Sequence, residues 1–298
     1  KQIVKNALND EMFNEINKIV TTTDGINLRL KNLKPNLSED YILYLNSSGI
    51  PTEIPVVLSR GVHSNLTTWE TLAGELANEG RDAWLIEITG GPGQDCDSCP
   101  NYNFSDLTDN YWPTIINGVL DFTGADKIQY IGHSNGGRVA IESLANNIID
   151  PNKIDTFIGV AVPSVFEGYS TFGYYFGKYG EQIMNELSAK SHVSMTEIGD
   201  KLRNSCRKDI DLSCFTLTLG LKSPSKMSFN VDKQYYLWII NETDEQIGKN
   251  LNLDNFYIIQ GWVIDRDYGN VSHDFIVTGQ DENAIYGNII SSNKKHYK

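Results

Sequence analysis

The 298-residue sequence predicts an α/β protein with a mostly parallel sheet, helices on both faces and one insertion. Two observations predict this class. Short apolar segments rich in β-branched residues alternate with longer segments of helical periodicity, as expected when parallel strands are buried on both faces. In addition, one such strand, at residues 127–131, leads through a glycine-rich turn into a helix at residues 138–147.

The first part of the chain precedes this alternation. Residues 1–20 predict an amphipathic helix, because apolar residues from Ile3 to Ile19 follow a rough helical stripe. Two strand-like segments come next, at residues 25–33 and 41–46.

The alternation itself runs from residue 54 to residue 162. A helix capped by Ser105 is indicated by Leu107, Tyr111, Ile115 and Val119, which repeat every four residues. The other predicted elements are strands at residues 54–59, 82–88, 127–131 and 155–162 and helices at residues 67–80 and 138–147. Strands joined by helical connections of this kind pair in parallel.

The pattern changes between residues 164 and 232, and we interpret this segment as an insertion into a core of residues 1–163 and 233–298. It opens with an aromatic run that glycines interrupt. These aromatic side chains fit two interpretations equally, the lining of an acyl or aromatic pocket and a core of the insertion itself. Beyond the insertion the predicted elements are strands at residues 234–240 and 255–263 and a final helix at residues 284–290.

Composition limits the partners. The net charge of −13 and the isoelectric point near 4.8 argue against nucleic acid or an anionic membrane surface, because both bind basic surfaces. No apolar run approaches the roughly 20 residues of a membrane span, so the sequence predicts a soluble protein. The acidic residues Asp95, Asp97, Asp106 and Asp109 lack the spacing of a calcium loop, and no metal or organic cofactor is expected.

The four cysteines form two local pairs, Cys96 with Cys99 and Cys206 with Cys214. They predict two disulfides in an oxidising compartment. A four-cysteine zinc site is the alternative, although its two halves would have unequal spacing. Six sequons for N-glycosylation also fit export, but a chain so rich in asparagine contains several by chance. The sequence therefore predicts an extracellular or cell-surface protein.

The turn after the strand at residues 127–131 reads Gly132-His133-Ser134-Asn135-Gly136 and fits the G-x-S-x-G pattern of a nucleophilic serine. Such a turn is sharp and strained, and small residues two positions before and after the serine let strand and helix approach. The serine then lies at a helix N-terminus, where free N–H groups and the helix dipole stabilise an oxyanion. The pattern predicts Ser134 as a nucleophile.

In the segment from Gly124 to Gly137, the chain resembles the α/β-hydrolase superfamily, specifically its serine esterases and lipases. The resemblance runs from about residue 25 to the end, apart from the insertion, which falls where the family carries a lid. It implies the α/β-hydrolase fold and a hydrolase that cleaves small or lipid-like carboxylic esters through an acyl-enzyme, without a cofactor. Amidase or thioesterase chemistry and a non-catalytic binding or assembly module remain alternatives.

The resemblance also implies a catalytic triad in the chain order Ser134, Asp244, His273. A serine hydroxyl needs a base that is largely unprotonated near neutral pH, and histidine meets this requirement. Of the five histidines, only His63, beside the expected oxyanion loop, competes with His273. The acid would fix the tautomer of that histidine. Asp244 follows a predicted strand at the position the family uses, and Asp265 is the alternative.

We expect the oxyanion hole to use the backbone amides of Val62 and Asn135. Family members often carry His-Gly at the end of the third strand, whereas this chain has Arg60-Gly61-Val62. The chemistry needs only a backbone N–H, so the changed side chain does not remove the donor. Arg60 itself fits a role in shaping the site, in binding a substrate carboxylate, or in a surface ion pair.

Overall fold

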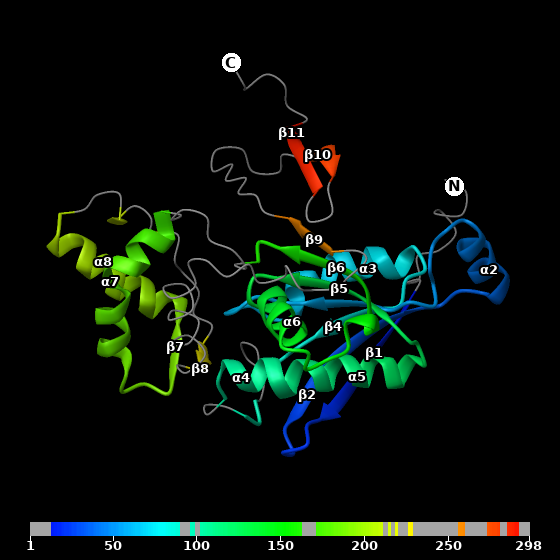
Figure 1. The fold of residues 1–298 in the computed structure, drawn as a ribbon, viewed down its shortest axis with the longest axis horizontal. Helices are drawn as coiled ribbons and strands as arrows, with labels where there is room; N and C mark the ends of the chain where they lie inside the picture. Colours follow the sequence, from blue (N-terminus) through cyan, green and yellow to red (C-terminus); the bar gives the residue numbers. More distant parts are fainter. Residues whose placement is uncertain are drawn as a thin grey trace.

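The computed structural model describes residues 13–89, 96–98, 102–162 and 171–210, with short segments after them. These segments are residues 214–215, 218–219, 226–228, 256–259, 273–280 and 285–291. A seven-stranded sheet in the order β1-β2-β4-β3-β5-β6-β9 lies at the centre of the described chain (Figure 1).

Five neighbouring strands of this sheet, from β4 to β9, are parallel, and β2 and β1 extend it in antiparallel pairing. The strands are β1 (Phe13–Thr21), β2 (Asn27–Pro35), β3 (Val56–Ser59), β4 (Ala83–Ile86), β5 (Ile128–His133), β6 (Ile154–Val160) and β9 (Phe256–Ile259). The predicted mostly parallel sheet is confirmed.

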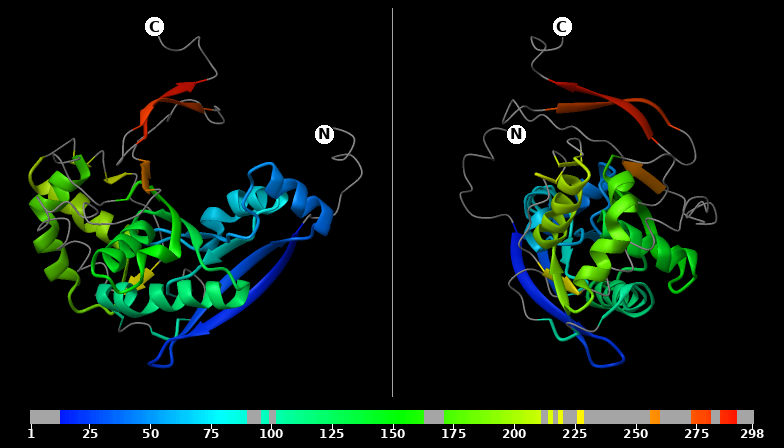
Figure 2. Two further views of the ribbon diagram at one scale, coloured as in Figure 1. Left: turned by 45° about the vertical axis from the view of Figure 1, so that its right-hand side comes forward. Right: turned by 90° about the vertical axis from the view of Figure 1, so that its left-hand side faces the viewer.

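Helices cover both faces of the sheet, α3 (Glu70–Asn78) on one and α5 (Trp112–Thr123) and α6 (Asn135–Ala145) on the other (Figures 1 and 2). Consecutive strand residues point to opposite faces. On β3, Val56 therefore packs in the hydrophobic cluster of α3, whereas Val57 packs in the cluster of α5 and α6. The remaining helical segments of the core are α2 (Glu39–Ser47), η1 (Leu66–Trp69), α4 (Phe104–Asp106), η2 (Leu107–Tyr111) and η3 (Pro151–Lys153).

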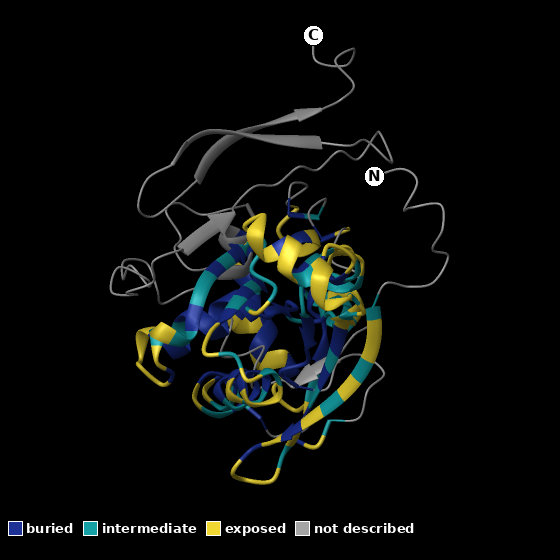
Figure 3. Cartoon of the chain, turned by 90° about the vertical axis from the view of Figure 1, so that its right-hand side faces the viewer, coloured by how far each residue is buried: buried dark blue, intermediate teal, exposed yellow. Residues whose placement is uncertain are grey.

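The predicted N-terminal helix is wrong for residues 13–20, which belong to β1, while residues 1–12 lie outside the described residues. Ile16 and Val20 turn inward with the Lys18 stem between them, and Ile19 is exposed. Figure 3 shows the alternation of exposed and less exposed residues along this strand. A ladder with β2 along the full length of β1 outweighs the weak helical stripe.

The predicted strand at residues 41–46 is also wrong, because these residues lie in α2. The hydroxyl of Ser38 caps this helix by accepting from the amide of Tyr41, and Glu39 and Asp40 occupy the first turn. Leu45 is buried, while Leu43 and Tyr44 are exposed. The cap and the acidic first turn therefore favour a helix here more strongly than the short apolar run favours a strand.

The helix after the cysteine loop begins at Phe104, and its cap is Asn103 instead of Ser105. The Asn103 side chain accepts from the amide of Asp106, whose carboxylate in turn accepts from the amide of Asn103. This reciprocal pair satisfies two free donors of the helix start. The carboxylate of Asp106 thus has a role in capping this helix.

The last described elements are an antiparallel pair, β10 (His273–Gln280) and β11 (Ile285–Ser291). The predicted final helix at residues 284–290 is therefore wrong, since β-branched and aromatic residues here pair with a neighbouring strand. The predicted strand at residues 234–240 lies outside the described residues. Among the described strands, β9 pairs directly with β6.

Within the predicted insertion, α7 (Thr171–Leu187) and α8 (Met195–Lys208) share a hydrophobic cluster that includes no core residue. Two short strands, β7 (His192–Ser194) and β8 (Lys226–Ser228), pair beside them. Tyr175 and Tyr179 belong to this cluster, so for these two aromatic residues the interpretation as the insertion's own core is the correct one.

The predicted disulfide between Cys206 and Cys214 is present at the end of α8. Cys96 is also disulfide-bonded, and its predicted partner, Cys99, lies outside the described residues. Within the described part of the chain, no helix combines the length and the hydropathy that a membrane crossing requires.

Candidate active site

Ser134 joins the end of β5 to the start of α6 with φ 49° and ψ −120°. A non-glycine residue in such a sparsely populated conformation costs on the order of 1–3 kcal/mol. The amide of Ser134 donates to the carbonyl of Val160 at 2.9 Å, which fixes the turn to the neighbouring strand β6. The residue is only partly buried, so a ligand can reach it.

Two glycines make this turn possible. A Cβ on Gly132 would lie 2.5 Å from the Cα of Gly137, and a Cβ on Gly136 would lie 2.4 Å from the carbonyl oxygen of Arg60. Both obstacles are backbone atoms, which cannot move aside as a flexible side chain can. The hydroxyl of Tyr130 donates to the carbonyl of Gly136 at 2.7 Å from the buried face of β5. Close backbone contacts at Gly132 and Gly136 and the hydrogen bond from Tyr130 therefore fix the serine turn.

The loop after β3 touches the serine. A Cβ on Gly61 would lie 3.1 Å from the Cβ of Ser134 and 2.9 Å from Nδ1 of His133. Val62 follows immediately, and Asn135 is the first residue of α6, where helix amides lack intrahelical partners. The structure thus brings the segments of both predicted oxyanion donors, Val62 and Asn135, next to Ser134.

His133 and Trp69 border the same loop. Their rings meet edge to face with centroids 6.2 Å apart, and the indole N–H of Trp69 donates to the carbonyl of Ser59 at 2.8 Å. Burial lowers the pKa of His133, so this imidazole stays neutral near pH 7. His63 is buried and has φ 59°.

Arg60 forms a buried ion pair with Glu87, and this replaces the surface ion pair that was one interpretation of the sequence. Only 5% of the Arg60 side chain and 2% of the Glu87 side chain are exposed. Burial raises the pKa of Glu87 to about 7, and Arg60 opposes this effect. Sequence reasoning missed Glu87, although an acid between Ile86 and Ile88 on a buried strand signals a paired charge.

The predicted base lies on a strand, and the predicted acid lies outside the described residues. His273 is the first residue of β10 and pairs with Ser291, whereas the sequence predicted a loop position after a strand. The hairpin of β10 and β11 lies beyond β9, away from α6 (Figures 1 and 2). Asp244 and Asp265 lie outside the described residues. Among the described residues, the structure therefore brings Asn135 and the loop of Gly61 and Val62 next to Ser134, but it does not join β10 to them.

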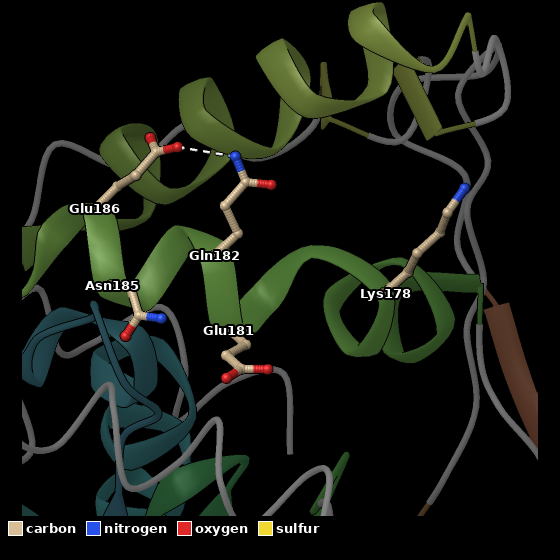
Figure 4. A pocket seen from close by; sticks show the side chains of 5 residues that line it. All are labelled: Lys178, Glu181, Gln182, Asn185 and Glu186. Atoms are coloured by element: carbon tan, nitrogen blue, oxygen red, sulfur yellow. Dashed lines mark hydrogen bonds between the residues drawn. The ribbon is translucent and has the colours of Figure 1, made fainter.

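Two other kinds of site, a metal site and a surface pocket, have less support. Among the described residues no group of histidine, cysteine, aspartate and glutamate side chains could hold a metal ion. An open depression lies on α7, within the predicted insertion (Figure 4), and contains none of the predicted site residues. It is lined by α7 side chains alone, namely Lys178, Glu181, Gln182, Asn185 and Glu186.

No protein-family model matches the sequence. The chain is 28% identical to gastric triacylglycerol lipase of Rattus norvegicus over 130 residues, which are 39% of this chain and 33% of that lipase. It is 21% identical to gastric triacylglycerol lipase of Bos taurus over 247 residues, or 74% of this chain and 57% of the lipase. The matches thus span less than two thirds of these relatives. An esterase from Exiguobacterium antarcticum superposes with a TM-score of 0.48 at 15% identity, covering 82% of this chain and 80% of the esterase.

Proposed function

Because the chain belongs to the α/β-hydrolase superfamily, we propose that it is a serine hydrolase that cleaves carboxylic esters through an acyl-enzyme. The observation that carries the proposal is the strained turn at Ser134. Glycines flank this turn at positions where the neighbouring backbone leaves no room for a Cβ. A backbone that is this costly persists where the surrounding structure over-determines it, commonly at active sites.

In the proposed reaction, Oγ of Ser134 attacks the ester carbonyl carbon while His273 takes the hydroxyl proton. The amides of Val62 and Asn135 donate to the oxyanion of the tetrahedral intermediate. The intermediate collapses, the C–O bond to the alcohol breaks, and the alcohol leaves with the proton from the imidazolium. Water activated by the same histidine then hydrolyses the acyl-enzyme. Asp244 orients the imidazole and stabilises its charged form.

Asp265 is the second candidate for the acid, and one observation favours it. β9 pairs with β6, and both run parallel to β5, so their carboxyl ends lie at the same edge of the sheet as Ser134. Asp265 is the first acidic residue in the sequence after β9. Asp244 instead follows residues 234–240 in the sequence.

The relatives suggest the substrate and the compartment. Both gastric lipases are named for triacylglycerol, so we propose a lipid-like ester as the substrate of this chain. The Cys206–Cys214 disulfide supports an oxidising compartment, because disulfides persist there and are rare in the cytosol. We propose a secreted or cell-surface location, with N-glycosylation at some of the sequons.

Labelling with a fluorophosphonate tests the proposal, since only an activated serine reacts quickly with this probe. We expect the wild-type protein to take up one label at Ser134 and to hydrolyse short activated esters. Ser134→Ala should abolish both while leaving the thermal midpoint within a few degrees, because a smaller side chain adds no clash. A protein that is folded, unlabelled and inactive in its wild-type form would instead support a binding module on this fold.

A further inference from the structure

The side chain of Arg60 is fully engaged by the protein. Its Nε and Nη2 groups contact Oε1 of Glu87 at the end of β4. Its Nη1 group donates to the carbonyl of Gly61 at 3.0 Å, and Nη2 donates to the carbonyl of Thr89 at 3.2 Å. With 5% of the side chain exposed, this guanidinium is not available to a substrate carboxylate, which was one interpretation of the sequence.

The bond to Gly61 acts on the peptide unit that contains the amide of Val62. A trans peptide is planar, and its C=O and N–H groups point in opposite directions. Fixing the Gly61 carbonyl on one side therefore fixes the direction of the Val62 N–H on the other. A Cβ on Gly61 would lie 3.1 Å from the Cβ of Ser134, so a rotation of this peptide would displace a donor beside the nucleophile.

The backbone of Arg60 contributes a second constraint. Its carbonyl oxygen packs against Gly136, at 2.4 Å from the position of a Cβ there. The main chain of Arg60 thus contacts the first turn of α6, while its side chain holds the following peptide. Glu87 completes the arrangement, because a planar guanidinium that is held by a carboxylate has a defined orientation.

We infer that Arg60 is a positioning residue that orients the Val62 amide of the oxyanion hole and that Glu87 holds Arg60 in place. This inference rests on the proposed function, since an oxyanion hole matters only for acyl transfer. Where family members often carry His-Gly after the third strand, this chain has the guanidinium of Arg60, which contacts both Glu87 and the carbonyl of Gly61. The positioned amide should stabilise the transition state, in which the oxyanion develops, and should contribute little to binding the uncharged ester.

The decisive variant is Arg60→Lys, which keeps the positive charge next to Glu87 but cannot reach both Glu87 and the Gly61 carbonyl as a fork does. We expect kcat to fall about 10- to 100-fold with KM within about threefold, as for a misplaced transition-state donor. Arg81→Lys is the matched control. Arg81 donates to the carbonyl of Ile54 and to Gln129, at the opposite end of the strands from Ser134, so its kcat should be unchanged.

Glu87→Gln provides a conservative test of the second residue, because the amide oxygen still accepts from Arg60. We expect kcat to fall less in Glu87→Gln than in Arg60→Lys, and less than in Glu87→Ala. An Arg60→Lys protein with wild-type kcat, or one in which KM alone rises, would overturn the inference.

Hydrogen exchange at the Val62 amide separates this inference from the proposed function. The exchange rate should rise in Arg60→Lys and stay unchanged in Arg81→Lys, whether or not the protein hydrolyses esters. If wild-type protein neither takes the fluorophosphonate label nor cleaves esters, the proposed function fails while a changed exchange rate still supports the positioning of the peptide. An unchanged Val62 exchange rate in a folded Arg60→Lys protein would reject it.

Discussion

The turn at Ser134 depends on glycines beside it, because there is no room for a Cβ at their positions. Gly136 lies under the serine, and its Cα faces the carbonyl of Arg60 and the side chain of Ser59 so closely that any Cβ would overlap them. Gly74, in the middle of α3, has a different environment. The nearest atoms to a Cβ there are ring carbons of Phe13 at 3.8 Å, an ordinary van der Waals distance.

These two glycines should respond oppositely to alanine. Gly136→Ala overpacks a backbone contact and should lower the free energy of unfolding by about 2–3 kcal/mol. Gly74→Ala removes chain entropy from the unfolded state in a helix interior and should raise it by about 0.5–1 kcal/mol. Urea unfolding of the two variants against wild type measures both. Equal effects would mean that the contacts at Gly136 relax without cost.

The same residues explain what could be predicted at this scale. The glycine pattern around Ser134 is local, because strand, turn and helix are contiguous in the chain and the close contacts follow from their geometry. The pairing of Arg60 with Glu87 joins the ends of two neighbouring strands. A single sequence shows each charge but not its partner, so a surface ion pair remained one of three interpretations of Arg60.

At the scale of elements, the central strands were predicted because their own composition determines them. β3, β4, β5 and β6 are short and apolar, with both faces covered, and each is followed or preceded by a helix of clear periodicity. β1 and β11 depend on a partner strand for their ladder, and this partner is not visible in the local pattern. The helix α2 was not predicted because the apolar run at residues 41–46 also fits a strand, although Ser38, Glu39 and Asp40 before it are start signals of a helix.

The position of β9 leads to a comparison of two acids. Asp265 lies only eight residues before His273 in the sequence, so its carboxylate would reach the far side of the imidazole only if the chain folded back. We therefore expect Asp244→Asn to lower kcat by roughly 10³ to 10⁴ and Asp265→Asn to lower it less than about tenfold. The amide replaces the carboxylate without changing its shape, so stability should be similar. Ester hydrolysis by both variants, at matched thermal midpoints, provides the ranking. The opposite ranking would assign the acid to Asp265, in agreement with the direct pairing of β9 with β6.

At the scale of the whole molecule, the described residues form separate hydrophobic clusters. Two clusters belong to the sheet and its helices, and the third is made entirely of residues in the insertion, where the Cys206–Cys214 disulfide closes a short loop. The described chain before the predicted insertion nevertheless passes close to the nucleophile. The predicted insertion follows β6, whose residue Val160 accepts from the amide of Ser134. Because the cluster of the predicted insertion includes no residue of the sheet or its helices, we expect the core to fold without it.

Replacing residues 164–232 by a short glycine-serine linker should therefore leave the sheet folded and Ser134 reactive toward a small fluorophosphonate. The discrimination between long and short acyl chains should decrease, because this segment directly follows β6 in the sequence, and β6 contacts the turn at Ser134. The ratio of kcat/KM for a long-chain and a short-chain ester measures this, with the labelling rate as the control for an intact nucleophile. An unchanged ratio in a folded, labelled deletion would mean that the insertion takes no part in selecting the acyl group, and loss of labelling would mean that the core needs the insertion for its own geometry.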